Sequence, residues 1–248
     1  MRPVRCLIGL GLAALVCLAP AFAERPAPSR DLVTGIEAYN RGDFDGARRH
    51  LQAAADRGEA EAMVNLGYLY ARGQGVPRNP DVALQLYRRA AATGDGEAMN
   101  AVGYRYNFAT PPDLDKAIEW YCRAVFAGNP RAMNNLALLF YRGQGIPVDR
   151  NEARSLWRQS SERGHMNATA LLAWDQASDM SLSPEQRREG ADKLRDAAMR
   201  GSAVAQEVLR NAGSQERFPP PSESSLTMKL EPRNPVAGTS RACSSLIS

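Results

Sequence analysis

Small and apolar residues recur along the middle of the chain with a period of about 36 residues. Gly58, Gly94, Gly128, Gly164 and Gly201 mark this period, because their successive spacings are 36, 34, 36 and 37 residues. An alanine follows each of these glycines by four residues, and an alanine or a serine precedes each by four. A register that is kept over five units indicates an internal repeat.

Within each unit the apolar positions have helical spacing. In the second unit, Ala62, Leu66 and Tyr70 fall on one face of a first helix, and Ala83 and Tyr87 fall on one face of a second. The small residues allow two backbones to approach closely, and the aromatic residues fill the space that remains. Each unit is therefore predicted to be a pair of packed helices.

The residues between the expected helices suit turns and caps. The periodic glycines are placed to end each second helix in a left-handed conformation. Residues 73–77 and 143–147 are matching Gly-x-Gly turns that end in proline, and Asp113 and Asp149 are expected to cap the helices that follow. Residues 108–112 replace the glycine turn in the third unit, so the conformation of that turn is left open.

One helical pair cannot bury its own apolar face, whereas stacked pairs can. The sequence therefore predicts an all-α fold, a right-handed α/α solenoid of about five helical hairpins with a capping helix. The solenoid is expected at 24–213, with units at 29–58, 59–94, 95–128, 129–164 and 165–201 and a cap at 202–213. Residues 214–248 are rich in Pro and Ser without periodicity, and are expected to be a disordered tail.

The first residues have the layout of a secretory signal peptide. Arg2 and Arg5 precede an unbroken apolar run at 6–19, and an Ala-x-Ala sequence ends at Ala23. We expect residues 1–23 to be removed and the mature protein to be periplasmic or secreted, without membrane insertion. An uncleaved anchor and a lipoprotein are the alternatives.

Charge and cysteine content narrow the function. The formal net charge is +4, and loss of two arginines and no acids with the leader lowers it to +2. Nucleic-acid binding proteins carry a concentrated basic face, so this near-neutral balance argues against that class. Only Cys122 and Cys243 remain after cleavage, so helix packing must supply the stability.

Three motifs resemble the Sel-1-like repeat family, relatives of the tetratricopeptide repeat: residues 62–67, the turn at 73–77 and residues 86–91. The same elements return at 120–124 and 132–137. The resemblance implies an adaptor whose partner is another protein or a peptide segment, such as an envelope sensor or an export component. A scaffold subunit of an export or polysaccharide machine is a further possibility. Some cysteine-rich relatives are linked to β-lactam binding or hydrolysis, but their regularly spaced cysteine pairs are absent here.

A search for reactive residues identifies no catalytic, metal or cofactor site. The Ser-x-x-Lys and Lys-Thr-Gly motifs of β-lactamases do not occur, nor does a Gly-x-Ser-x-Gly elbow. His50 and His165 have no second ligand at a metal-binding spacing. An envelope hydrolase acting on β-lactams or peptidoglycan is thus an alternative without an identified nucleophile. Trp120 and Trp157 are interpreted as packing residues.

The first helices carry polar and aromatic residues at positions that the core pattern does not use. In tetratricopeptide-like solenoids such positions line the concave face, where rings supply area, amides bond a peptide backbone and Arg binds a carboxylate. The predicted partner-binding residues are Tyr68, Arg72, Asn100, Tyr104, Asn134, Arg142 and Trp174. Tyr68, Tyr104 and Trp174 are expected to be partly exposed. The alternative is that several of these residues only pack between neighbouring helices.

The two remaining cysteines form a separate hypothesis. The counterparts of Cys122 in the other units are the polar residues Gln52, Arg88, Arg158 and Arg195, so Cys122 is expected on the solvent-exposed outer side. Disulfides form and persist in oxidising compartments. Cys122 and Cys243 are therefore a possible disulfide, within one chain or between two, and two unpaired thiols are the alternative.

Overall fold

The computed structural model describes residues 27–212 and Cys243, and in this part of the chain it contains eleven α-helices and no strand. The predicted signal peptide, and the predicted tail apart from Cys243, lie outside the described residues. The helices are α1 (Arg30–Asn40), α2 (Phe44–Asp56), α3 (Ala60–Arg72), α4 (Pro80–Ala91), α5 (Gly96–Asn107), α6 (Leu114–Phe126), α7 (Pro130–Arg142), α8 (Arg150–Glu162), α9 (Met166–Ser178), α10 (Pro184–Met199) and α11 (Ala203–Ala212).

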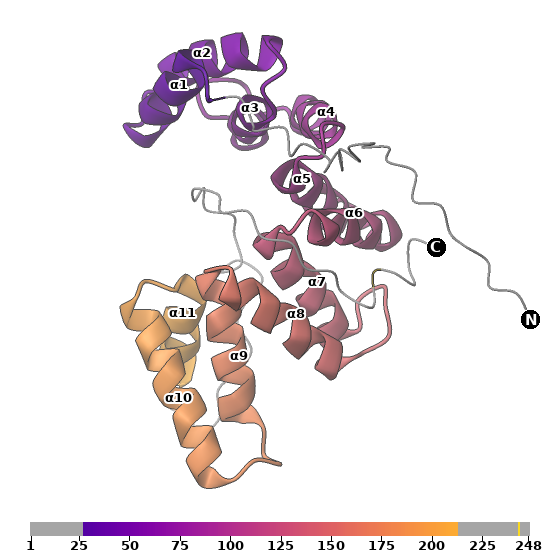
Figure 1. The fold of residues 1–248 in the computed structure, drawn as a ribbon, viewed down its shortest axis with the longest axis vertical. Coiled ribbons are helices and arrows are strands. Elements are labelled where there is room, and N and C mark those ends of the chain that lie inside the picture. The colour runs from indigo at the N-terminus through magenta and orange to yellow at the C-terminus, as the bar shows by residue number, and fades with distance from the viewer. Residues whose placement is uncertain (1–26, 213–242, 244–248) are drawn as a thin grey trace, which may run out of the picture.

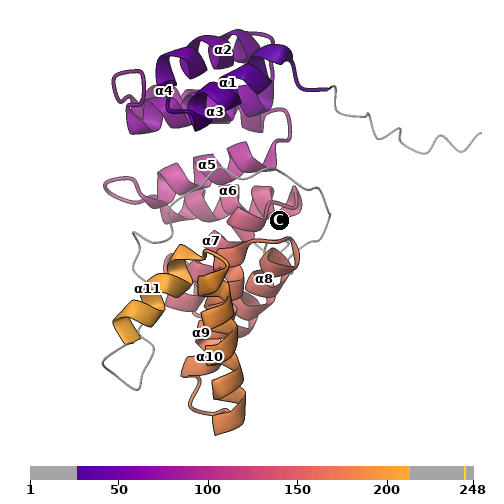
Figure 2. The ribbon, with the colours of Figure 1, turned by 90° about the vertical axis from the view of Figure 1, so that its left-hand side faces the viewer.

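The helices pack as consecutive pairs, α1 with α2 through α9 with α10, and α11 closes the array against α9 and α10. First helices also contact one another, since α3 touches both α1 and α5, and α5 touches α7. The array forms an arc, with the first helices toward its inner side and α1 and α11 at its two ends (Figure 1). A view turned by 90° shows the pairs stacked in sequence order (Figure 2). The prediction of an all-helical repeat solenoid is confirmed.

The predicted turn chemistry is also confirmed. The periodic glycines that follow the second helices all have positive φ, from 76° to 94°. The Asp113 carboxylate accepts a hydrogen bond from the Lys116 amide, and that of Asp149 accepts one from Glu152. These caps satisfy amides that have no partner inside the helix.

The turn of the third unit, residues 108–113, differs from the glycine turns of the second and fourth units, residues 73–79 and 143–149. Gly73 and Gly143 end α3 and α7 in the left-handed conformation, whereas Phe108 ends α5 with φ −107°. Residues 108–113 join α5 to α6, one residue fewer than 73–79 or 143–149, and the Thr110–Pro111 peptide is cis.

Small residues and rings fill the core as the repeat predicts. A Cβ added at Gly67 would overlap the ring of Tyr87, which lies on the second helix of the same unit. Trp157 is fully buried, which confirms its packing role, while the half-buried Trp120 lies under the Arg123 guanidinium, 4.7 Å away. No described helix is long and apolar enough to cross a membrane.

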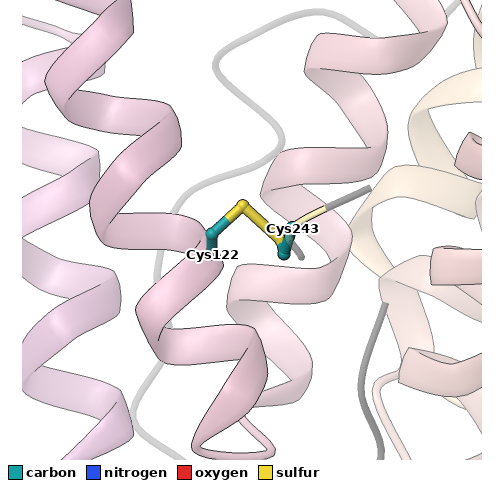
Figure 3. The surroundings of a disulfide bond; sticks show 2 residues. All are labelled: Cys122 and Cys243. Carbon is teal, nitrogen blue, oxygen red and sulfur yellow. A yellow bond between two sulfur atoms is a disulfide. The ribbon is translucent and has the colours of Figure 1, made fainter. Parts of the chain in front are cut away.

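The structure joins Cys122 and Cys243 in a disulfide within one chain, and Figure 3 shows their side chains meeting beside α6. The expectation that Cys122 is exposed is wrong, because its exposed fraction is 0%. Of its four counterparts, Arg88, Arg158 and Arg195 are exposed and Gln52 is half-buried. The outer surface is therefore covered at α6 and open at the equivalent positions of α4, α8 and α10.

Candidate functional site: a pocket between two repeats

A pocket of about 270 Å³ opens between α5, the turn that follows it, and α7. We call it the central pocket. Its lining residues are Tyr104, Asn107, Phe108, Ala109, Pro112, Leu114, Asn135, Leu138, Leu139, Arg142 and Gln144. Because α5 and α7 are first helices of adjacent units, the pocket lies at a boundary between two repeats.

One wall of the pocket is aromatic. The rings of Tyr104 and Phe108, one helical turn apart, have centroids separated by 4.4 Å. Phe108 is 43% exposed, which is unusual for a side chain of this size next to a packed core. The turn that lacks a left-handed glycine holds Phe108 in this position.

The opposite wall supplies amides and a cation. Asn135 on α7 donates a hydrogen bond of 2.9 Å from Nδ2 to Oδ1 of the buried Asn100 on α5, which orients the Asn135 amide. Arg142 stands at the end of the same helix. Amides can bond a peptide backbone, and a guanidinium can bind a carboxylate through two hydrogen bonds. The pocket can therefore hold an extended segment with an apolar and an anionic group.

Of the seven predicted partner-binding residues, the structure brings only Tyr104 and Arg142 into this pocket. The expectation that Tyr68 and Trp174 are partly exposed is wrong, because their exposed fractions are 4% and 5%. Asn100 and Asn134 are also buried, with 0% and 3%.

Contacts between neighbouring helices account for this burial. Tyr68 packs against the ring of Tyr87 and donates its hydroxyl hydrogen bond to Glu97 of the next unit. Trp174 packs edge-on against Tyr141. For these residues the alternative of packing between neighbouring helices describes the structure.

Arg72 is exposed but lies away from the central pocket. Its guanidinium donates a hydrogen bond of 3.0 Å to the hydroxyl of Tyr39 in the first unit and lies over the Tyr68 ring. Arg72 thus connects the first two units, and nothing in its position links it to the pocket.

A charged network at the starts of α5 and α7 ties three units together. The Glu97 carboxylate accepts hydrogen bonds from Tyr68 of the preceding unit, and from Asn129 and Arg131 of the following one. The Glu97 and Arg131 side chains are only 11% and 13% exposed. Removing one partner of such a pair leaves a poorly solvated charge, so the network holds the three units in one arrangement.

The network and the burial around it shift the ionisation of two groups. Burial, followed by the charge of Glu97, raises the pKa of Tyr68 well above its ordinary value. Burial, followed by the charge of Arg131, lowers the pKa of His165 to about 4. His165 accepts a hydrogen bond from the Ala168 amide as the N-cap of α9, which accounts for this histidine structurally.

Sequence reasoning missed Asn107, Asn135 and the pocket-forming role of residues 108–112. The available signal was the replacement of the glycine turn in the third unit by residues 108–112, between two units that keep it. Among residues 27–212 and Cys243, no three His, Cys, Asp or Glu side chains are grouped in a way that could hold a metal ion.

Comparison with known proteins identifies the repeat. The Sel1 repeat model matches residues 35–59, 60–95, 96–129 and 130–165. An F-box protein of Arabidopsis thaliana is 30% identical over 146 residues, covering 55% of this chain and 40% of that protein. The chain thus spans less than half the length of this curated relative.

Two solved structures have the same architecture. A Sel1 repeat protein from Oxalobacter formigenes is 25% identical, with a TM-score of 0.63, covering 80% of this chain and 84% of that one. A protective antigen of uropathogenic Escherichia coli strains is 26% identical, with a TM-score of 0.61, covering 79% of this chain and 43% of that one.

Proposed function

The chain belongs to the Sel1 repeat family, whose members are generally protein-interaction modules, and from this premise we propose that it binds a partner protein in the central pocket. The observation that carries the proposal is the meeting of Tyr104, Phe108 and Arg142 around one opening between α5 and α7. The Sel1 repeat fold is typically a non-enzymatic scaffold, and this chain is proposed to act in that way.

The pocket chemistry suggests the class of segment. Two rings on one wall favour an apolar or aromatic side chain, because burying such a side chain supplies most of the affinity of a small interface. Asn107, Asn135 and Gln144 offer amides to an extended backbone. Arg142 favours a carboxylate nearby. The proposed ligand is an extended peptide with one apolar anchor beside an acidic residue or a chain end.

We also propose that the protein acts outside the cytoplasm, in the periplasm or after secretion. The signal-peptide layout of residues 1–23 supports this proposal, and so does the disulfide, which is favoured in oxidising compartments. Expression of the full chain followed by sequencing of the mature end should give Glu24 as the first residue. A retained leader would contradict the cleavage proposal.

The binding proposal is tested by site-specific crosslinking in the cell envelope. A photo-crosslinking amino acid at position 104 should capture a partner, and capture should fall about tenfold or more when Arg142→Ala is added, because a charge-assisted hydrogen bond contributes roughly 1.5–3 kcal/mol. The same crosslinker at the exposed outer position of Arg88 is the matched control and should not capture that partner.

The double variant Tyr104→Ala/Arg142→Ala should keep nearly the melting temperature of the unmodified protein, because neither side chain belongs to the buried core. Loss of the fold in this variant would favour a packing role for the two residues. Capture that is equal at positions 104 and 88 would overturn the central-pocket proposal.

A further inference from the structure

A groove with a volume of about 720 Å³ lies between α8 and α10, and α9 forms its floor. We call it the charged groove. Both flanking helices pack on α9, and Leu172, Ala173 and Leu182 supply apolar surface to the floor. The charged side chains that line it are Arg154, Arg158, Asp175, Asp179, Asp192, Lys193 and Asp196. The groove shares no lining residue with the central pocket, so the two are separate surfaces.

Two repeat positions that are apolar in the earlier second helices are polar in this groove. Three residues before the periodic glycine stand Ala55, Ala91 and Val125, and eight residues before the next one stand Leu86, Trp120 and Leu156. All of these are buried except Trp120, which is half-buried. In the charged groove the same two positions hold the half-buried Ser161 and the exposed Lys193. Because both sides lack an apolar side chain there, this boundary between second helices stays open.

The place of this unit near the end of the array does not account for these polar residues. Terminal repeats of a solenoid carry polar residues on the face that has no neighbouring repeat. Asp192, Lys193 and Asp196 instead lie on the side of α10 that faces α8, at a boundary inside the array. Apolar residues at such a boundary would stabilise the fold. Polar residues there therefore point to a role other than stability.

The α8 rim of the groove presents a positive charge. Arg158 is exposed and forms no ion pair or hydrogen bond with the residues that the structure describes. Arg154, one helical turn earlier, is already engaged, because its guanidinium lies 2.5 Å from the Asp175 carboxylate and 2.8 Å from that of Asp179. These pairs hold the rim against α9 and leave Arg158 available to a ligand.

The α10 rim presents negative charge. Asp192 and Asp196, one helical turn apart, pair with exposed arginines further along the same helix. Exposed pairs of this kind contribute little to stability, so a ligand can replace them at small cost. Lys193, which lies between the two acids, is neutralised by Glu189 of its own helix, 2.8 Å away. The two rims therefore offer opposite charges across an apolar floor.

We propose that the charged groove binds a helix of a partner protein, with acidic residues along one edge of that helix and basic residues along the other. Residues four apart on a helix lie roughly 6 Å apart on one side, as Asp192 and Asp196 do. A helix lying along the groove presents its side chains at the same spacing. Its basic edge meets Asp192 and Asp196, its acidic edge meets Arg158, and apolar residues between them cover Leu172 and Leu182.

This contact does not depend on the central pocket. The chain can hold one partner between α5 and α7 and a second partner between α8 and α10, which makes it a connector of two proteins.

The test uses a stapled helical peptide with Glu along one edge, Lys along the other and Leu between them. Fluorescence anisotropy of the labelled peptide, titrated with the mature chain, should show saturable binding that weakens as NaCl is raised. Arg158→Glu should weaken binding about tenfold or more, because it places like charges opposite each other. A second peptide with Lys in place of Glu should bind the Arg158→Glu protein better than the unmodified one.

Two matched controls accompany the titration. A peptide of the same composition with its charges scrambled should bind about tenfold more weakly or not at all. Arg88→Glu changes the exposed arginine at the same repeat position two units earlier and should leave peptide binding unchanged.

Absence of saturable binding, equal binding of the ordered and scrambled peptides, or equal losses in Arg158→Glu and Arg88→Glu would each overturn the proposal. Partner capture by the crosslinker at position 104 should be unchanged in Arg158→Glu. That measurement separates a failure of the charged groove from a failure of the central pocket.

Discussion

The glycine turns of the second and fourth units and the turn of the third unit occupy the same place in the repeat but contact different surroundings. A Cβ added to Gly75 would lie 2.7 Å from the Phe44 backbone, and one added to Gly145 would lie 2.6 Å from Leu114 Cβ. Both glycine turns therefore press against the start of a helix in the preceding unit. The turn at 108–113 instead exposes Phe108 and borders the central pocket.

This difference indicates where the molecule departs from uniform packing. The glycine turns of the second and fourth units pack against the preceding unit, and the fourth-unit turn also supplies Gln144 to the central pocket. In the third unit, which lacks the glycine turn, Phe108 is exposed and forms part of the pocket wall. The irregular unit is therefore the better place to look for recognition, and the regular units are the better measure of stability.

The largest expected effect tests whether the irregular boundary is as firmly packed as the regular one. Leu66 of α3 and Leu136 of α7 occupy the same repeat position and are 1% and 0% exposed. Each Leu→Ala variant should lose roughly 2–5 kcal/mol of unfolding free energy. Thermal and urea unfolding of the two variants measure the loss of unfolding free energy. A Leu136→Ala protein that melts like the unmodified chain would show a loosely packed core beside the pocket.

A smaller effect is expected at the turns themselves. Gly145→Ala introduces a side chain at φ 70° and close to Leu114, so we expect a loss of about 1–3 kcal/mol. Thr110→Ala, in the exposed part of the third turn, should stay within about 0.5 kcal/mol. Urea unfolding of the two variants compares them directly. Similar losses would mean that the third turn also seals a boundary.

The smallest effect on stability separates two phenylalanines. Phe44 is half-buried between Tyr39 and the Gly75 turn, whereas Phe108 is 43% exposed. Phe108→Ala should change unfolding free energy by less than about 1 kcal/mol but reduce partner capture at the pocket. Phe44→Ala should lower the unfolding free energy by more than Phe108→Ala does and leave partner capture at the pocket unchanged. Crosslinking yield and melting temperature, measured on both variants, give the comparison.

The sequence was sufficient for the elements and insufficient for their surroundings. Helix pairs, the glycine-terminated second helices and the caps at Asp113 and Asp149 all follow from local chemistry repeated at a fixed period. The exposure of a side chain does not follow from local chemistry, because residues on adjacent helices can cover it. The position of Tyr68 matches a surface-lining position, yet Glu97 of the next unit and Tyr87 of its own unit cover it.

Cys122 shows the same limit over a longer distance. Its polar counterparts correctly mark an outward position, but the residue that covers it stands 121 positions later in the chain. The central pocket likewise required the geometry of residues 108–113, for which the repeat offers no template. Pattern analysis could mark this turn as different without showing that it opens a site.

The bond between Cys122 and Cys243 also changes how the molecule bears a mechanical load. When the two ends of the chain are pulled apart, the force applied after Cys243 acts on α6, because the disulfide connects Cys243 directly to that helix. The force at the other end acts on α1. Tension then runs through the first three units, while α7 to α11 lie within the covalent loop and are bypassed. Until the disulfide is reduced, stretching the protein would unfold the half before Cys122 and leave the other half slack.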